Sequence, residues 1–287
     1  MVVLFRRDND ALDINPPTGD STLGQSGSDW LWAVTAVYVV SLISVLIHSH
    51  FARVGEKIFH YLFTISLFAG AIAYFAMASD LGSVAVPQVN QLNDYPGSRQ
   101  IFYAKYINWF VGWTPLVLAV SLLSGVSWAT VFYHVVLTWV WVVSWLAGAL
   151  TMTNYKWGFF AFGLVAYFVL AVSLLHYGRQ AAVRVGISKH YLPLTGWLVF
   201  LWLLYSIAYG ISDGGNEISV TSSFIFFGIL DLLTVPVIGW AFIILSNRWD
   251  YGVLNLQFTQ YGRVPAQSGT YPEREKGTAA AAPVNPA

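Results

Sequence analysis

The feature that most constrains this chain is a long segment without charge. From Tyr106 to Tyr155 there is no Asp, Glu, Lys or Arg. A single helix of that length, rising about 1.5 Å per residue, would be roughly twice as long as a bilayer is thick. The segment must therefore fold back on itself, and Gly125 with the flanking Ser124 and Ser127 is the expected turn. We predict two membrane-spanning helices here, over residues 102–123 and 128–152.

The overall composition supports a membrane protein. Of 287 residues, 56% are hydrophobic and 10% are charged, which is too apolar a balance for a soluble globular domain. The apolar runs are continuous and do not alternate, which disfavours a transmembrane β-barrel. The 14 basic and 14 acidic residues cancel, so no charged field would recruit nucleic acid. The absence of cysteine excludes disulfides and thiolate chemistry.

Further apolar runs have about the 20 residues that a bilayer-spanning helix needs. They cover residues 31–47, 58–79, 157–178, 190–212 and 218–247. We therefore expect an all-α fold, a seven-transmembrane helix bundle over residues 29–247, with a flexible N-terminal tail (1–28) and a disordered cytoplasmic tail (248–287). Basic residues gather between spans one and two, between spans five and six, and after span seven, which predicts an outside N-terminus and a cytoplasmic C-terminus.

Asp231 lies near the middle of the last apolar run. A charged side chain at that depth costs about 2.5–3.5 kcal/mol on insertion scales, so such residues are usually partnered or protonated. One interpretation is a counter-ion or proton-handling carboxyl, and the other is a structural clasp. For the clasp we expect hydrogen bonds from Tyr74 and Tyr205, with Lys105 as a candidate charge partner if it turns inward instead of extending towards the membrane surface.

Other polar and aromatic residues share faces with this carboxyl. Val235 lies one helical turn after Asp231 and should also face the interior. In the sixth span an aromatic stripe, at helical spacing, is either core packing or a ligand wall: Trp202, Tyr205 and Tyr209. In the third span we expect one common face for Lys105, Asn108 and Trp109.

The sequence offers no recognisable enzyme or metal chemistry. His60 and His134 lie at span ends, where single histidines are usually interfacial hydrogen-bonding groups. No His, Asp or Glu spacing is typical of a metal site, and there is neither a nucleophile elbow nor a glycine-rich phosphate loop. We therefore expect no metal and no enzymatic activity.

Several motifs in order along residues 29–245 resemble those of the microbial (type 1) rhodopsin superfamily, most closely its fungal branch. They are RQIFYAKYINW at 99–109, YKWGFFAFG at 155–163, WLLY at 202–205, YGISDGGN at 209–216 and FGILDLL at 227–233. The resemblance implies a retinal pocket formed by Tyr74, Asn108, Trp109, Trp202, Tyr205, Tyr209, Asp231 and Val235.

The chain departs from that family pattern at the positions that hold retinal and carry protons. In pigment-forming members a lysine four residues after the seventh-helix Asp holds retinal as a Schiff base, and here that position is Val235. Valine has no amine, so covalent retinal is excluded and the pocket is degenerate. Asn108 occupies the place of the proton acceptor, Lys105 that of the neighbouring arginine, and Val120, or Ala119, that of the proton donor. Of the proton-relay positions, Asp231 alone remains.

This loss pattern resembles opsin-related proteins of fungi, which include heat-shock-inducible plasma-membrane proteins of yeasts. The resemblance implies a retinal-independent, stress-linked protein of the plasma membrane, a chaperone or modulator that contacts other membrane proteins such as a proton ATPase. The sequence does not determine whether the protein forms a homo-oligomer. Two alternatives remain: a light-independent ion transporter or channel that uses Asp231, and a sensor that binds retinal or another apolar ligand non-covalently between Trp109, Trp202 and Tyr205.

Overall fold

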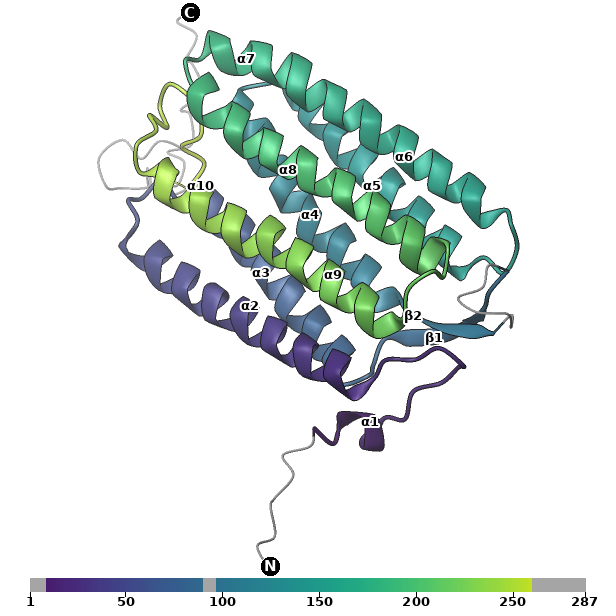
Figure 1. Cartoon of the computed structure of the whole chain (residues 1–287). Helices are drawn as coiled ribbons and strands as arrows, with labels where there is room; N and C mark the ends of the chain where they lie inside the picture. Colours follow the sequence, from purple (N-terminus) through teal and green to yellow (C-terminus); the bar gives the residue numbers. More distant parts are fainter. Residues whose placement is uncertain (1–8, 90–96, 260–287) are drawn as a thin grey trace, which may run out of the picture.

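The computed structural model describes residues 9–89 and 97–259. Within them, seven helical segments are long and apolar enough to cross a membrane, which confirms the predicted seven-helix fold. They pack side by side along a common direction (Figure 1). The first four spans are single helices: α2 (Gln25–Phe51), α3 (Ile58–Ala78), α4 (Tyr103–Ser124) and α5 (Trp128–Leu150). The fifth span is continuous through α6 (Lys156–Val172), η1 (Ser173–Gly178) and α7 (Arg179–Arg184). The sixth consists of α8 (Ser188–Tyr209) and η2 (Gly210–Gly214), and the seventh of α9 (Val220–Leu232), η3 (Leu233–Val237) and α10 (Ile238–Ser246).

The predicted turn inside the uncharged segment is confirmed. Gly125 ends α4 in the left-handed conformation, with φ 72°, which glycine adopts without steric cost. Its backbone N–H donates to the Leu122 carbonyl at 3.1 Å. The Ser127 hydroxyl then caps α5 by accepting from the Thr130 backbone N–H at 3.3 Å.

A β-hairpin, which the apolar runs of the sequence do not predict, closes one end of the bundle. Strands β1 (Ser83–Pro87) and β2 (Ser98–Phe102) pair antiparallel, with Ser83 opposite Phe102. The third span therefore begins at Tyr103, because Phe102 belongs to the strand. We call this end of the molecule the hairpin end (Figure 1).

The prediction of a flexible tail over residues 1–28 is wrong for residues 9–28, the part of it that the structure describes. Helix α2 begins at Gln25 and not at Asp29, and a short helix, α1 (Ala11–Ile14), precedes it. Leu23 is 1% exposed, so this segment packs on the domain. The Ser98 backbone N–H donates to Asp20 at 2.7 Å, and this bond lowers the pKa of Asp20. Residues 1–8 of the predicted tail lie outside the described residues.

The predicted C-terminal tail also begins too early. Trp249 and Tyr251 are buried, and both rings contact Phe59 of α3. The Trp249 indole N–H donates to His190 Nδ1 at 2.8 Å, which ties the segment to α8. Burial raises the pKa of the Tyr251 phenol. Residues 260–287 lie outside the described residues.

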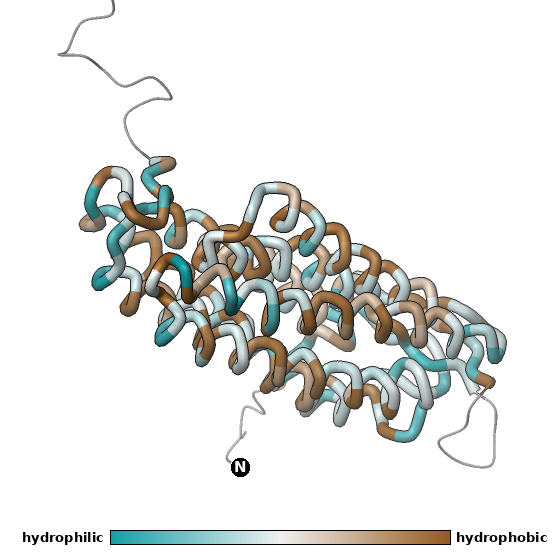
Figure 2. Tube along the Cα trace, turned by 90° about the horizontal axis from the view of Figure 1, so that it is seen from above, coloured by the Kyte–Doolittle hydropathy of each residue, from teal (hydrophilic) through white to brown (hydrophobic). Residues whose placement is uncertain are grey.

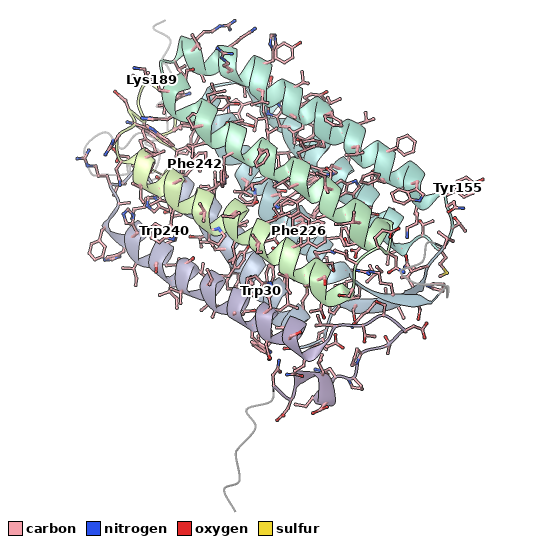
Figure 3. All side chains as sticks on the ribbon, in the orientation of Figure 1. Trp30, Tyr155, Lys189, Phe226, Trp240 and Phe242 are labelled. Atoms are coloured by element: carbon pink, nitrogen blue, oxygen red, sulfur yellow. The ribbon has the colours of Figure 1, made fainter. Side chains whose placement is uncertain are left out.

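Hydropathy follows the bundle. Apolar segments run along the helices, and hydrophilic segments gather towards their ends (Figure 2). Side chains fill the space between helices, with Tyr155 and Lys189 at opposite ends of the bundle (Figure 3). Trp30 of α2 lies beside α9, where its indole N–H donates to the Phe224 carbonyl at 3.1 Å (Figure 3).

Candidate functional site

The centre of the site is the carboxyl group of Asp231 on α9, which is 1% exposed. Tyr74 of α3 donates to Oδ2 at 2.5 Å, and Tyr205 of α8 donates to Oδ1. Trp109 of α4 donates its indole N–H to Oδ1 at 3.1 Å. The predicted tyrosine contacts are therefore confirmed, and the carboxyl joins α9 to three other helices.

A further tyrosine brings α2 into the same cluster. The Tyr38 hydroxyl donates to the backbone carbonyl of Asp231 at 3.2 Å, and its ring stacks on Tyr74 with centroids 5.3 Å apart. Gly70 of α3 makes room for that ring, since a Cβ at Gly70 would lie 2.1 Å from a Tyr38 ring carbon. Any larger residue at position 70 would displace Tyr38 and loosen the packing between α2 and α3.

Lys105 is not the charge partner of Asp231, which corrects the prediction. Its Nζ lies 2.6 Å from Asp213 Oδ2, and it is 2% exposed, so it does not extend towards the membrane surface either. Tyr106 donates to the same oxygen at 2.7 Å. The ammonium also lies 4.1 Å from the centre of the Phe227 ring, a cation–π distance.

Asp213 follows the predicted sixth span, 190–212, which would place it in the loop before the predicted seventh span, 218–247. The structure instead continues α8 into η2, so Asp213 remains helical and 3% exposed. Its spacing from Tyr209 and Tyr205, four and eight residues, was the available signal, because residues four apart share a helix face. We name Arg99, Lys105, Tyr106 and Asp213 the ionic cluster.

Arg99 of β2 completes the ionic cluster at the hairpin end. Its Nε lies 3.6 Å from Asp213 Oδ1, and its Nη1 donates to Asn216 Oδ1 at 2.9 Å and to the Ile218 carbonyl at 2.6 Å. The side chain is fully buried, and this burial lowers the pKa of the guanidinium, an effect that Asp213 opposes. The buried guanidinium of Arg99 thus joins β2 to η2 and to the residues that lead into α9.

Beyond Asp231 the interior is filled by indole rings. Trp113 of α4 stacks on Trp109 with centroids 5.1 Å apart. It also lies 4.9 Å from the Trp141 ring, 5.7 Å from Trp202 and 4.9 Å from Tyr205, again between centroids. We call Trp109, Trp113, Trp141, Trp202 and Tyr205 the aromatic cluster. Trp113 and Trp141 were missed, although Trp113 lies four residues after Trp109.

The last residue of the predicted stripe, Tyr209, packs in a neighbouring layer. Its ring stacks on Trp145 at 4.8 Å and on Phe160 at 5.4 Å, and its hydroxyl donates to the Trp145 carbonyl at 3.0 Å. Gly148 makes room for that hydroxyl, which would lie 2.7 Å from a Cβ. Tyr209 therefore links α8 to α5 and α6, and does not contact Asp231 directly.

Val235 lies in η3, one turn after Asp231, and is 3% exposed. The segment is a π-helix, a form often found at functional positions, and Pro236 removes one backbone donor from it. The isopropyl group of Val235 cannot form an imine. The residues at this position therefore do not fit a covalently bound retinal.

Asn108 does not lie in the predicted pocket. It is 5% exposed and lines a groove between α3 and α4 on the lipid-facing side, and within the described residues it makes no hydrogen bond to Asp231. Lys105, Trp109 and Trp113 repeat every four residues and face inward, so the intervening Asn108 is rotated away by about 100° from Trp109. Val120 and Ala119 are buried apolar side chains.

The two histidines are more buried than a position at the span ends suggests. His134 is 0% exposed and bonds to Ser121 at 2.8 Å and Ser173 at 2.7 Å. His60 lies 2.9 Å from the His48 ring nitrogen. In the part of the chain that the structure describes, no group of three or more His, Cys, Asp or Glu could hold a metal.

These features define a class, a seven-helix membrane protein in which a buried carboxyl of the last span is held by tyrosines and a tryptophan from neighbouring helices. The family model described as "Bacteriorhodopsin-like protein" matches residues 25–251. The chain therefore belongs to the bacteriorhodopsin-like family.

Its relatives include fungal proteins. Protein FDD123 of Trametes versicolor is 38% identical over 88% of this chain and 89% of its own length. The 30 kDa heat shock protein of Saccharomyces cerevisiae is 34% identical over 85% of this chain and 80% of its own length. Among solved structures, the light-driven proton pump of Coccomyxa subellipsoidea is 27% identical, with a TM-score of 0.75 over 78% of this chain and 98% of that one.

Proposed function

We propose that this opsin-related integral membrane protein works without retinal, through contacts with other proteins of the plasma membrane during stress. The observation that carries the proposal is Val235, a buried side chain without an amine at the position where pigment-forming relatives carry the retinal lysine. A Schiff base needs a primary amine, so the light-absorbing chemistry of the family has no attachment point there.

The packing between the three residues expected to flank a ligand supports the same conclusion. Trp113 lies between Trp109, Trp202 and Tyr205, the three residues expected to flank a ligand, and its ring centroid is 4.9–5.7 Å from each of theirs. Rings at these separations are in contact. A non-covalent ligand in this place would have to displace a buried indole ring, which argues against the sensor alternative.

The hydrogen bonds of Asp231 favour a structural role for it. Its donors are two phenols and an indole, and none of them carries a charge. A carboxyl that accepts three such bonds links four helices without needing a counter-ion. We therefore assign Asp231 to assembly of the bundle.

The arrangement of polar groups along α4 argues against the transporter alternative. Lys105 belongs to the ionic cluster near the hairpin end, and Ser121 bonds to His134 near the other end. Between them α4 presents Trp113 and Val120, both buried and without a titratable group. A proton or ion would have to cross this apolar layer, for which the cost is several kcal/mol.

The name of one relative, the 30 kDa heat shock protein, supports the link to stress. Partners are expected in the membrane, because the outward faces of the spans carry large apolar side chains, such as Phe162 and Phe168, that are more than half exposed. A plasma-membrane proton ATPase is the first candidate partner.

The test is crosslinking in native membranes followed by capture of the tagged chain, before and after heat treatment. We expect a reproducible membrane-protein partner whose yield rises with heat. An unrelated tagged seven-helix protein in the same membranes is the control. The absence of any partner beyond this control, together with an ion flux in vesicles of purified protein, would overturn the proposal in favour of a transporter.

A further inference from the structure

The aromatic cluster continues as an unbroken series of ring contacts to the outer surface of the bundle. At its inner end Trp113 lies 4.9 Å from Tyr205 and 4.9 Å from Trp141, measured between ring centroids. Trp141 lies 5.2 Å from Trp145. Rings at these separations are in contact, and electrons pass readily between aromatic rings in contact. The series is therefore an electron path through the dry interior of the protein.

The series reaches the surface at α6. The Phe160 ring lies 5.8 Å from Trp145 and 5.7 Å from Trp157, again between centroids. Trp157 is the second residue of α6 and is 37% exposed, two residues after the exposed Tyr155 at one end of the bundle (Figure 3). Tryptophan near the end of a span is typical of the boundary between head groups and acyl chains. An oxidant formed in the membrane can therefore remove an electron from this end of the series.

The indole groups inside the series lack hydrogen-bond acceptors. Trp113 Nε1 and Trp141 Nε1 are buried and have no hydrogen-bond partner among the described residues. Buried donors are nearly always paired, so these two require an explanation. An indole that has lost an electron is stabilised by giving up its N–H proton, which needs an acceptor. Since neither indole has one, the oxidation is not fixed at Trp113 or Trp141 and moves along the series.

Tyr205 differs from these indoles because it has a proton acceptor. Its hydroxyl donates to Asp231 Oδ1. A phenol that has lost an electron is a strong acid, and a carboxylate can take its proton. Tyr74 donates to the other oxygen of Asp231, but its ring stacks on Tyr38 and contacts none of the described tryptophan rings. Of the two phenols on this carboxyl, Tyr205 is thus the one with an electron path.

One other tyrosine combines a ring contact with a carboxylate. Tyr106 lies 5.1 Å from the Trp109 ring and donates to Asp213 at 2.7 Å. Asp213 already pairs with the ammonium of Lys105 at 2.6 Å, and a proton arriving there would break that buried pair. Asp231 accepts from neutral groups and is therefore the better acceptor.

We propose that Tyr205 is a redox-active tyrosine that takes up the oxidising equivalent of a lipid peroxyl radical arriving at Trp157. The peroxyl radical gains one electron from the ring series and one proton from water, and becomes a lipid hydroperoxide. Tyr205 loses one electron to the series and its phenolic proton to Asp231 Oδ1, which leaves a neutral tyrosyl radical beside a protonated carboxyl. Tyr205 is 0% exposed, so this radical is kept away from acyl chains. The role adds to the structural one of Asp231 and needs no partner protein.

The test uses the full chain in vesicles of unsaturated phosphatidylcholine, in air, with a lipid-soluble azo initiator that supplies peroxyl radicals. Electron paramagnetic resonance after rapid freezing detects tyrosyl radicals. A water-soluble paramagnetic relaxing agent distinguishes a buried radical from those of exposed tyrosines such as Tyr155 and Tyr177. We expect a tyrosyl signal that this agent does not relax. The signal should be lost in Tyr205→Phe and retained in Tyr74→Phe, which removes the other phenol on the same carboxyl.

Four further variants examine the proton and the path. Asp231→Asn keeps an oxygen that accepts a hydrogen bond but cannot take the proton, so the buried signal should be lost. Trp113→Phe and Trp157→Phe each keep a ring but remove an oxidisable indole, and both should lower the signal. Trp197→Phe is the matched control for Trp157→Phe and should leave the signal unchanged, because Trp197 is 44% exposed on α8 and makes no ring contact among the described residues.

Four results would overturn the proposal. The first is the absence of a buried tyrosyl signal in the unaltered chain. The second is a signal that survives in Tyr205→Phe and is lost in Tyr106→Phe, which would place the radical in the ionic cluster. The third is an undiminished signal in Asp231→Asn. The fourth is equal signals in Trp157→Phe and Trp197→Phe, and this surface pair decides the outcome if Tyr205→Phe does not fold.

Discussion

Asp213 and Asp231 are both buried carboxyls, but the donors that hold them differ, and this difference predicts unequal costs of substitution. Asp213 accepts from the ammonium of Lys105 at 2.6 Å. Asp231 accepts from neutral hydroxyl and indole groups. Asp213→Asn therefore leaves the buried ammonium of Lys105 without its carboxylate. Asp231→Asn leaves no cation unpaired, and the new side chain still has an oxygen that can accept a hydrogen bond.

The magnitudes follow from these contacts. Lys105 is 2% exposed, and removing one partner of a buried ion pair costs about 3–5 kcal/mol. At about 2–4 °C per kcal/mol for a chain of this size, Asp213→Asn should lower the Tm by about 6–20 °C. Asp231→Asn should cost about 1–2 kcal/mol, the price of one rearranged hydrogen bond, or about 2–8 °C.

The assay is thermal unfolding of the purified chain in detergent, followed by tryptophan fluorescence. Lys105→Met combined with Asp213→Asn removes both charges and should recover at least half of the lost stability, because Arg99 keeps its bonds to Asn216 and the Ile218 carbonyl. Glu56→Gln is the control. It breaks an exposed pair with Arg53 at 3.8 Å, and should change the Tm little.

Two results would refute this reasoning. If the double variant is no more stable than Asp213→Asn alone, Lys105 does not depend on that carboxylate. If Asp231→Asn is as destabilising as Asp213→Asn, then Asp231 carries a charge that the described hydrogen bonds do not explain.

Three further predictions concern retinal, light and acid. Val235→Lys alone should give no visible pigment with all-trans retinal, whereas Val235→Lys with Trp113→Gly should form a borohydride-reducible adduct, because the ring of Trp113 fills the space between Trp109 and Tyr205; an adduct on the unaltered seventh span would contradict this. Illuminated vesicles of the unaltered chain should show no proton movement, and light-dependent acidification that an uncoupler abolishes would disprove it. The contact between Asp20 and Ser98 should be lost as the pH falls through the lowered pKa of Asp20. Within the acid range in which pepsin is active, cleavage within residues 9–24, relative to that of Asp20→Asn, should therefore rise as the pH falls; equal cutting of both at every pH would count against it.

Much of the fold could be predicted from the sequence, because a bilayer imposes length and polarity on each span. The uncharged run from Tyr106 to Tyr155 required a turn, and Gly125 supplies it. The tyrosine contacts of Asp231 were also predictable, since a carboxyl at mid-membrane needs donors and few are available. The hairpin was not, because β1 and β2 are short and only their pairing makes them strands.

The sequence by itself determined that the last span has a carboxyl at Asp231 and no amine at Val235, since both depend only on which residue occupies a position. Only the tertiary structure decided how the charges pair. Lys105 contacts Asp213 because η2 continues α8. Asn108 faces lipid because Lys105 and Trp109 lie on the inward face of α4. The physical reason is that helix periodicity fixes which residues share a face, whereas the packing of neighbouring helices fixes which face is turned inward and which donor reaches which acceptor.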